Sequence, residues 1–233
     1  EHLNSLRRLI IFKEIKMNNC KLVLFDMDGV TLDSEPLYAA GENKLFKEYG
    51  VIIPDEDWRL FRGCTEEEFY TLSMSRYKIK ENRKVFQKKG RRYVREEFKK
   101  NVSFMSGFRD LVAFLKKNNH QIGLVTASPE YMFSWLNSKL KLTSIFEHVV
   151  FREMTLESKP SPEPYLLAMS LFNISPKETM IIEDSVHGIK AGIRSGARVV
   201  ALTGSVNPED MPKVDKIINN LREIDNSFIG SLF

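Results

Sequence analysis

The sequence predicts an α/β protein with a doubly wound, Rossmann-like parallel sheet and an inserted α-helical cap domain. Two observations support this fold. Short apolar runs rich in β-branched residues alternate along the chain with helical patterns, as in βαβ units whose sheet is buried on both faces. In addition, residues 26–120 separate the first two runs. This interval is far longer than a crossover needs, since a whole βαβ unit takes about 30 residues.

The strands of the sheet are predicted where apolar residues cluster in runs too short for a buried helix. Six such runs occur, at residues 21–25, 121–126, 147–151, 179–183, 198–202 and 216–218. Between the first two, helical patterns cover residues 35–49, 65–77, 81–100 and 108–118. Thr65 followed by three glutamates is typical of a helix start, because a hydroxyl can cap free N–H groups and acids favour the first turn.

The domain boundaries follow from turn residues that flank the inserted helices. We assign residues 17–34 and 104–233 to the α/β core and residues 35–103 to the helical cap. Met17 directly precedes the first strand pattern and resembles a natural start. We therefore interpret residues 1–16 as an N-terminal extension.

Composition excludes several classes of protein. The chain has 233 residues, of which 42% are hydrophobic and 28% charged, values typical of a folded globular protein. No run approaches the roughly 18 apolar residues of a membrane span, and the first apolar run is shorter than the roughly 7 to 15 residues of a signal peptide. Cys20 and Cys64 form no CxxC pair, which excludes a disulfide framework and a zinc ribbon. We expect a cytoplasmic monomer with no membrane partner.

Positive charge is concentrated in one segment. Residues 76–100 contain twelve Lys or Arg against three Glu, whereas the whole chain has a net charge of +4. Such a run can form a solvated helix face, attract an anionic small substrate or bind nucleic acid. A solvated face is the commonest explanation, and we expect no nucleic-acid partner.

Four groups of polar residues follow predicted strands, at the edge where parallel sheets bind ligands. Asp26 and Asp28 end the first strand, although aspartate also favours turns for local reasons. Thr126, Ala127 and Ser128 end the second strand, where hydroxyls and amides can hold phosphate. We expect Ser128 to cap the helix that begins with Pro129.

The remaining two groups are a lysine and a second pair of acids. Lys159 lies among three prolines that stiffen the chain and can present its charge to phosphate. Glu183 and Asp184 are adjacent carboxylates at the end of a buried strand, an arrangement that is costly without a cation. Mg²⁺ explains the pair economically. Together the four groups predict a phosphoryl-transfer site with a hard cation.

This motif order resembles the haloacid dehalogenase superfamily. The resemblance rests on Asp26-Met27-Asp28-Gly29-Val30-Thr31-Leu32-Asp33-Ser34, Thr126, Lys159-Pro160 and Glu183-Asp184-Ser185, and extends from about residue 21 to the last predicted strand. The pattern is most similar to the subfamily of β-phosphoglucomutase and sugar-phosphate phosphatases with a helical cap.

The resemblance implies a role for each motif residue. Asp26 would be the nucleophile that forms an aspartyl-phosphate, and Asp28 the general acid and base. Thr126 and the Ala127 amide would bind the phosphoryl oxygens and Lys159 would offset their charge. Mg²⁺ would be bound by the Asp26 carboxylate, the Asp28 main-chain carbonyl and Asp184, with Glu183 as a further or water-mediated ligand.

The resemblance leaves two activities to compare. Lys89 matches a cap lysine of the mutases and could hold a distal phosphate. In contrast, Tyr38 stands where the mutases have a histidine, and Glu66 stands where their cap loop has an arginine, although Arg62 lies nearby in that loop and could contact the substrate. We predict a Mg²⁺-dependent phosphatase of a small phosphorylated metabolite, expected to be a sugar phosphate. The alternatives are a β-phosphoglucomutase-type phosphomutase and a non-catalytic binding protein on the same fold.

Overall fold

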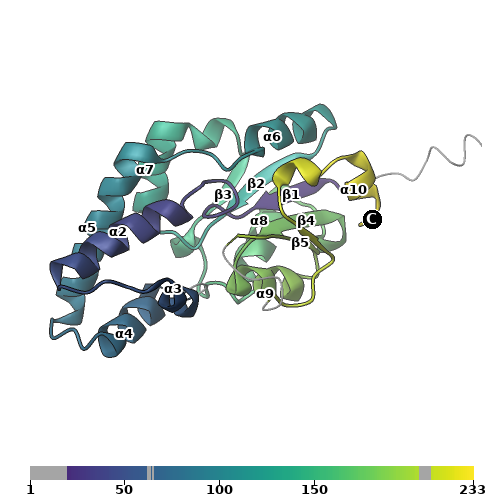
Figure 1. The fold of residues 1–233 in the computed structure, drawn as a ribbon. Coiled ribbons are helices and arrows are strands. Elements are labelled where there is room, and N and C mark those ends of the chain that lie inside the picture. The colour runs from purple at the N-terminus through teal and green to yellow at the C-terminus, as the bar shows by residue number, and fades with distance from the viewer. Residues whose placement is uncertain (1–19, 62–63, 65, 205–210) are drawn as a thin grey trace, which may run out of the picture.

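The fold is seen in a computed structural model, which describes residues 20–61, 64, 66–204 and 211–233 (Figure 1). The expected extension at residues 1–16 lies outside this part of the chain, as does Arg62.

A parallel sheet forms the centre of the core domain. Its six strands lie in the order β3-β2-β1-β4-β5-β6, and every neighbouring pair is parallel. Their bounds are β1 Leu22–Phe25, β2 Gln121–Val125, β3 His148–Val150, β4 Thr179–Glu183, β5 Arg198–Leu202 and β6 Lys216–Ile218. All six predicted strands are confirmed, three of them one or two residues shorter than expected.

Helices cover both faces of the sheet, which confirms the doubly wound arrangement (Figure 1). One face is covered by α6 (Phe108–Lys117), α7 (Glu130–Leu140) and the short α10 (Asn226–Gly230). The other is covered by α8 (Glu163–Phe172) and α9 (Val186–Ser195). Short 3₁₀ turns occupy Leu142–Ser144, Arg152–Met154, Pro176–Glu178 and Leu221–Glu223.

The side-chain alternation of β1 explains the two apolar layers. Successive strand residues point to opposite faces. Phe25 packs edge-to-face on Phe108 of α6, with ring centroids 5.6 Å apart. Leu24, on the opposite face, belongs to the apolar cluster that contains Tyr165 and Phe172 of α8. Because β1 is buried on both sides, its apolar run is continuous rather than alternating.

In the described residues of the inserted segment, four helices share an aromatic core of their own. They are α2 (Glu35–Glu48), α3 (Asp55–Phe61), α4 (Glu66–Arg76) and α5 (Arg83–Asn101). The sequence predicted α2, α4 and α5 but not α3. Phe46 lies at the centre of the aromatic core, with edge-to-face contacts to Phe69, Tyr77 and Phe86.

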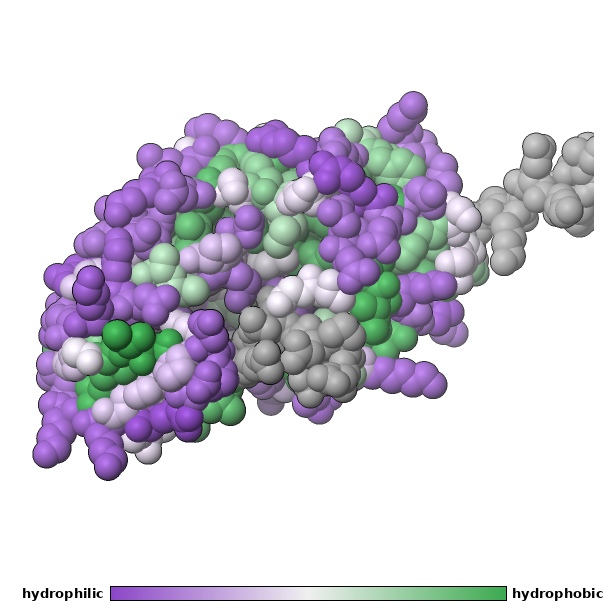
Figure 2. Space-filling model, viewed as in Figure 1, coloured by the Kyte–Doolittle hydropathy of each residue, from purple (hydrophilic) through white to green (hydrophobic). Residues whose placement is uncertain are grey.

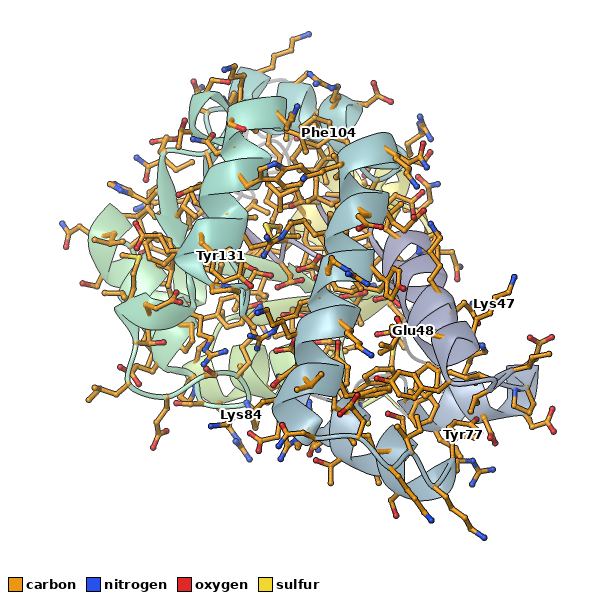
Figure 3. All side chains as sticks on the ribbon, turned by 90° about the vertical axis from the view of Figure 1, so that its left-hand side faces the viewer. Lys47, Glu48, Tyr77, Lys84, Phe104 and Tyr131 are labelled. Carbon is orange, nitrogen blue, oxygen red and sulfur yellow. The ribbon has the colours of Figure 1, made fainter. Side chains whose placement is uncertain are left out.

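Two connections join these helices to the sheet, and they run side by side. The N–H of Asp33 donates to the Ser103 carbonyl at 3.1 Å, and the N–H of Met105 donates to the Thr31 carbonyl at 2.9 Å. In Figure 3, α5 lies between α2 and the core helix α7. The Arg95 guanidinium lies 5.9 Å from the ring centroid of Tyr131 on α7. The cap therefore contacts the core through both its connections and α5.

The basic segment is the end of α4 together with α5, and much of it faces solvent. Figure 2 shows a largely hydrophilic surface along the outer edge of the cap. Several charges are paired, as in the bridge of Arg83 to Glu67 and that of Lys100 to Glu97. These features agree with a solvated helix face. In the described ranges, no helix combines the length and apolar character needed to cross a membrane.

Candidate active site

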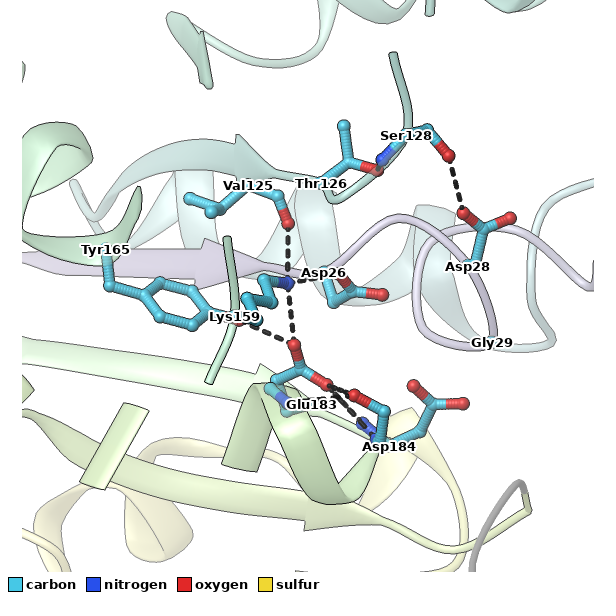
Figure 4. Close-up of polar contacts among 12 residues, drawn as sticks. Asp26, Asp28, Gly29, Val125, Thr126, Ser128, Lys159, Tyr165, Glu183 and Asp184 are labelled. Atoms are coloured by element: carbon cyan, nitrogen blue, oxygen red, sulfur yellow. Dashed lines mark hydrogen bonds and ion pairs between the residues drawn. The ribbon is translucent and has the colours of Figure 1, made fainter. Parts of the chain in front are cut away.

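The predicted site residues converge at one edge of the sheet (Figure 4). Phe25, the last residue of β1, is in register with Leu124 of β2 and Ile182 of β4. Since these strands are parallel, the residues that follow them emerge together at their carboxyl ends. This register places Asp26, Thr126 and Glu183 at the carboxyl ends of adjacent strands, although they are far apart in sequence.

A tight loop after β1 presents Asp26 and Asp28. Gly29 adopts φ 74°, a conformation that costs other residues energy. Its N–H donates to the Leu32 carbonyl at 2.9 Å and to the Ser34 hydroxyl at 3.2 Å. The Thr31 hydroxyl donates to the Asp26 carbonyl at 2.7 Å. These bonds fix the backbone from which both aspartates project.

Lys159 brings the first and fourth motifs together. Its ammonium donates to the carboxylates of Asp26 and Glu183, the latter at 2.7 Å, and to the Val125 carbonyl at 3.0 Å. Its side chain is only 5% exposed. Burial disfavours the ammonium, but the attraction of the two carboxylates outweighs burial and raises the pKa of Lys159. The lysine is therefore a fixed positive charge inside the site.

Asp26 is a buried acid whose ionisation is opposed by its surroundings. Burial raises the pKa of Asp26 to about 8, the charge of Lys159 counteracts this, and the nearby charges of Glu183 and Asp28 add to it. At neutral pH the carboxyl therefore needs more positive charge than Lys159 supplies to be ionised.

Glu183 is fully buried and holds Lys159 in place. Its Oε1 accepts from Lys159 and from the Tyr165 hydroxyl at 2.8 Å, and its Oε2 accepts from the N–H and hydroxyl of Ser185 at 3.1 and 3.0 Å. Burial opposes the charge, but Lys159 and these donors keep the pKa of Glu183 below its usual value. A Cβ on Gly188 would lie 1.7 Å from Oε1, so only glycine fits beside this carboxylate.

Asp28 has one engaged and one unpaired oxygen. The Ser128 hydroxyl donates to Oδ2 at 3.2 Å, whereas Oδ1 is buried and has no hydrogen-bond partner among the described residues. Burial raises the pKa of Asp28, and the hydroxyls of Ser34, Ser128 and Tyr38 partly oppose the rise. The raised pKa favours the protonated form of Asp28, and its buried Oδ1 has no hydrogen-bond partner among the described residues.

The loop after β2 differs from the prediction in one respect. Ser128 does not cap α7, because the residue before that helix is Pro129 and no side-chain cap bond forms. The Ser128 hydroxyl is instead directed to Asp28, and its N–H donates to Thr126 Oγ1 at 2.9 Å. Thr126 is buried, and a hydroxyl that accepts this bond can still donate its own hydrogen. Ala127 lies in the same bend, on the exposed side.

Three carboxylates form a candidate cation site. Asp26, Glu183 and Asp184 each offer a carboxylate oxygen, and these three atoms lie within 4.8 Å of one another. All three residues are buried. A set of hard oxygen donors with excess negative charge fits Mg²⁺ better than a softer ion. Because both oxygens of Glu183 already accept hydrogen bonds, Asp26 and Asp184 are the better placed of the three to bind it directly.

The two predicted cap contacts have different outcomes. Lys89 donates to Glu48 at 2.6 Å and to the Tyr49 hydroxyl at 2.9 Å. Glu48 is the last residue of α2, roughly 20 Å from the first at 1.5 Å per residue. The structure therefore does not bring Lys89 to the catalytic loops. Arg62 lies outside the described residues.

The structure shows the surroundings of Glu66 and Tyr38, the two positions where the sequence departs from the mutase pattern. Glu66 accepts a bidentate pair of bonds from Arg91, each 2.7 Å long. Its charge is therefore largely neutralised, so the expected repulsion of a second phosphate is weaker than a lone acid would give. Tyr38 packs edge-to-face on Phe98, with ring centroids 5.1 Å apart, and its hydroxyl lies beside Asp28.

Two residues that support Glu183, Tyr165 and Gly188, were not predicted from the sequence. Gly188 lies in the first turn of α9 after two buried acids, and a glycine at such a position can indicate close packing. Tyr165 carries no comparable signal in the sequence, since an aromatic residue on an apolar helix is ordinary core.

Comparisons with known proteins agree with this geometry. A phosphorylated carbohydrates phosphatase of Thermotoga maritima is 28% identical over 87% of this chain and 98% of its own. An N-acetylmuramic acid 6-phosphate phosphatase of Pseudomonas putida is 26% identical over 90% and 98%. Hexitol phosphatase A of Escherichia coli is 24% identical over 88% and 93%.

Solved structures show the same architecture. One from Thermotoga maritima, described as a candidate β-phosphoglucomutase, is 26% identical with a TM-score of 0.73 and covers 87% of this chain and 95% of its own. A hydrolase from Entamoeba histolytica reaches a TM-score of 0.78 at 21% identity, over 91% and 98%. Residues 23–202 match the model of the haloacid dehalogenase-like hydrolases, and the chain belongs to that family.

Proposed function

We propose that this protein is a Mg²⁺-dependent phosphatase that hydrolyses a small phosphorylated metabolite, a sugar or sugar-alcohol phosphate, through a phosphorylated Asp26. The observation that carries the proposal is the contact of Lys159 with both Asp26 and Glu183, beside the unpaired oxygen of Asp28. This arrangement supplies a nucleophile, a fixed positive charge and a proton donor within one buried site. Relatives named as phosphatases of phosphorylated carbohydrates and of N-acetylmuramic acid 6-phosphate support this substrate class.

In the first step, a carboxylate oxygen of Asp26 forms a bond to phosphorus and the bond from phosphorus to the alcohol oxygen breaks. Asp28 donates its proton to that oxygen, so the product leaves as a neutral alcohol. The ammonium of Lys159 offsets the negative charge between the phosphoryl group and Asp26. Thr126 and the Ala127 amide bind the phosphoryl oxygens.

In the second step, a water molecule attacks the phosphorus of phosphorylated Asp26. Asp28, now ionised, removes a proton from that water, and the bond from Asp26 to phosphorus breaks. Inorganic phosphate leaves and both aspartates return to their first state. The Ser128 hydroxyl, 3.2 Å from Asp28 Oδ2, orients the carboxyl in both steps.

Mg²⁺ would be held by the Asp26 carboxylate, the Asp28 main-chain carbonyl and Asp184. When bound, it would neutralise charge on the phosphate and the carboxylates. Glu183 serves Lys159 rather than the cation, because its oxygens are already occupied by donors. The raised pKa of Asp26, about 8, also supports a cation, since a nucleophile must be ionised at neutral pH.

Substrate would enter between the cap and the core. A cavity of about 560 Å³ opens between α4 and the first turns of α9, with Leu72, Val186 and His187 in its lining. Val186 is two residues after Asp184, and the volume suits a small metabolite. We propose that residues 35–103 act as a cap whose closure excludes bulk water. A cytoplasmic location and a monomeric state stay predictions.

The experiment is phosphate release from sugar phosphates, sugar-alcohol phosphates and nucleotides, with and without Mg²⁺, for the parent and Asp26→Asn. Release that requires both Mg²⁺ and Asp26 would support the proposal and rank the substrates. β-Glucose 1-phosphate with its bisphosphate activator is included. Isomerisation to glucose 6-phosphate with little release would instead identify a mutase.

A further inference from the structure

Tyr165 contacts both members of the buried ion pair at the centre of the site. It lies on α8, the helix that follows the Lys159 loop, and its side chain is fully buried. Its hydroxyl donates to Glu183 Oε1 at 2.8 Å, and the Lys159 ammonium lies 4.9 Å from the centroid of its ring (Figure 4). The steps of the mechanism above give this tyrosine no part.

The Tyr165 hydroxyl is a hydrogen-bond donor at neutral pH. Burial raises the pKa of Tyr165 well above its usual value, and the charge of Glu183 adds to the rise, so the hydroxyl keeps its proton. A hydroxyl that donates to a carboxylate forms a charge-assisted bond, which is stronger than a bond between neutral groups. Tyr165 therefore restrains Glu183 without adding charge to the site.

The Glu183 carboxylate has little freedom to turn. Its Oε2 accepts from the N–H and hydroxyl of Ser185 at 3.1 and 3.0 Å. Its Oε1 accepts from two donors among the described residues, Lys159 and Tyr165. Gly188 closes the adjoining space, since a Cβ there would lie 1.7 Å from Oε1. Without the Tyr165 hydroxyl, Oε1 would be held by the lysine that it is meant to hold.

The Lys159 ammonium has three hydrogens, and each has an acceptor. Two acceptors belong to the sheet, the Val125 carbonyl at 3.0 Å and Glu183 Oε1 at 2.7 Å. The third is the carboxylate of Asp26, the proposed nucleophile. The Tyr165 ring lies within the range of a cation–π contact with the same ammonium. Because the sheet holds two of the hydrogens, the third faces the place where the phosphoryl group is transferred.

We propose that Tyr165 is a positioning residue for phosphoryl transfer: through Glu183 it holds Lys159 so that one ammonium hydrogen faces the phosphoryl group as it passes to Asp26. This inference rests on the proposed function, because it concerns the step at Asp26. An ammonium that is already oriented stabilises the charge of the transition state without having to turn during the reaction.

The test compares Tyr165→Phe with the parent, in Mg²⁺, on p-nitrophenyl phosphate and on the sugar phosphate that the parent cleaves fastest. Phenylalanine keeps the ring beside Lys159 and removes only the hydroxyl. We expect kcat to fall about tenfold, the loss of one charge-assisted hydrogen bond, and KM to rise by a smaller factor. The fall should be alike on both substrates, because they share the phosphoryl group and differ in the leaving group.

Tyr77→Phe is the matched control. The Tyr77 hydroxyl also donates to a buried carboxylate, that of Asp57, but both residues lie in the cap domain. The two variants should lose similar amounts of melting temperature in EDTA, whereas only Tyr165→Phe should lose kcat.

A double-mutant cycle with Glu183→Gln locates the effect of the hydroxyl. Since Tyr165 acts on Lys159 through the charge of Glu183, Tyr165→Phe should lower kcat by less than about twofold when that charge is absent. Independent action would instead give the same tenfold loss in both backgrounds.

Magnetic resonance gives a readout that needs neither Mg²⁺ nor turnover. The ammonium hydrogens of Lys159 must leave their acceptors before they exchange with water, so the metal-free protein should give a proton–nitrogen signal for this group, identified by its absence from Lys159→Arg. Tyr165→Phe should raise the exchange rate severalfold, and Tyr77→Phe should leave it unchanged.

A kcat of Tyr165→Phe within about twofold of the parent, an equal loss in Tyr77→Phe, independent action in the cycle, or an unchanged exchange rate at Lys159 would overturn the inference about Tyr165. In each case phosphate release by the parent that requires Mg²⁺ and Asp26 would leave the proposed function standing. If the parent releases phosphate from none of the substrates, the proposed function fails, and the inference about Tyr165 fails with it.

Discussion

Replacement of Lys159 by methionine should destabilise the metal-free protein strongly. Methionine fills a similar volume but removes the charge shared by Asp26 and Glu183, of which Glu183 is fully buried and Asp26 is 8% exposed. Removal of one partner from a buried ion pair leaves an uncompensated charge and typically costs about 3–5 kcal/mol. That is a large share of a total unfolding free energy of about 5–15 kcal/mol.

The pH dependence of this loss has a definite sign. Without Lys159, the folded-state pKa of Asp26, already about 8 in the parent, rises further, and burial is expected to raise that of Glu183 above its unfolded value, so the folded state binds more protons than the unfolded state. Stability then increases as pH falls. Relative to the parent, the stability deficit of Lys159→Met should be larger near pH 8, where Asp26 with its pKa of about 8 is about half ionised in the parent, and smaller near pH 5.5.

The assay is urea unfolding followed by circular dichroism, with EDTA, at both pH values. The double variant Lys159→Met/Glu183→Gln should recover part of the loss, because it removes one uncompensated charge. Lys21→Met is the control, since the pair of Lys21 with Glu178 is exposed and should contribute less than about 1 kcal/mol. A loss below about 1 kcal/mol at pH 8, or a deficit that grows at pH 5.5, would refute the argument.

Three further predictions concern Asp28, Gly188 and His120. Asp28→Asn should lower kcat on alkyl phosphates about 10²- to 10⁴-fold. The loss of kcat on p-nitrophenyl phosphate should be smaller, because nitrophenolate leaves without a proton. Equal losses on both substrates would exclude Asp28 as the general acid. Gly188→Ala should cost about 1–3 kcal/mol in urea unfolding and lower kcat, since its Cβ would overlap Glu183, whereas Gly230→Ala, with no atom in the way, should cost nothing. Burial lowers the pKa of His120 below its usual 6.5, so the unfolded state binds the proton more readily and stability falls as pH drops below 6.5. His120→Gln should therefore flatten the decline of the melting temperature between pH 7 and pH 5. An unchanged slope would contradict this prediction.

The order of elements and the chemical character of the site could be predicted from the sequence. Buried parallel strands are continuous apolar runs, so Leu22–Phe25 and Thr179–Glu183 stand out between polar segments. Each run ends in a polar group, and such ends meet at one edge of any parallel sheet. These are local patterns, and they were sufficient to predict that Asp26, Asp28, Thr126, Lys159, Glu183 and Asp184 lie near one edge of the sheet. The short α3 was missed because one seven-residue helix has too weak a period.

Only the tertiary structure decided which side chains are partners. From the sequence, the Ser128 hydroxyl was expected to cap the helix that follows it. In the structure the loops after β1 and β2 pack together, and this hydroxyl donates to Asp28 instead. Lys89 matches the position of a cap lysine of the mutases, but its ammonium donates to Glu48 at the far end of α2. Tyr165 and Gly188 both contact Glu183, which belongs to another element. Hydrogen bonds and charges act across a few ångströms of space regardless of sequence distance, so their pairing depends on how the chain packs.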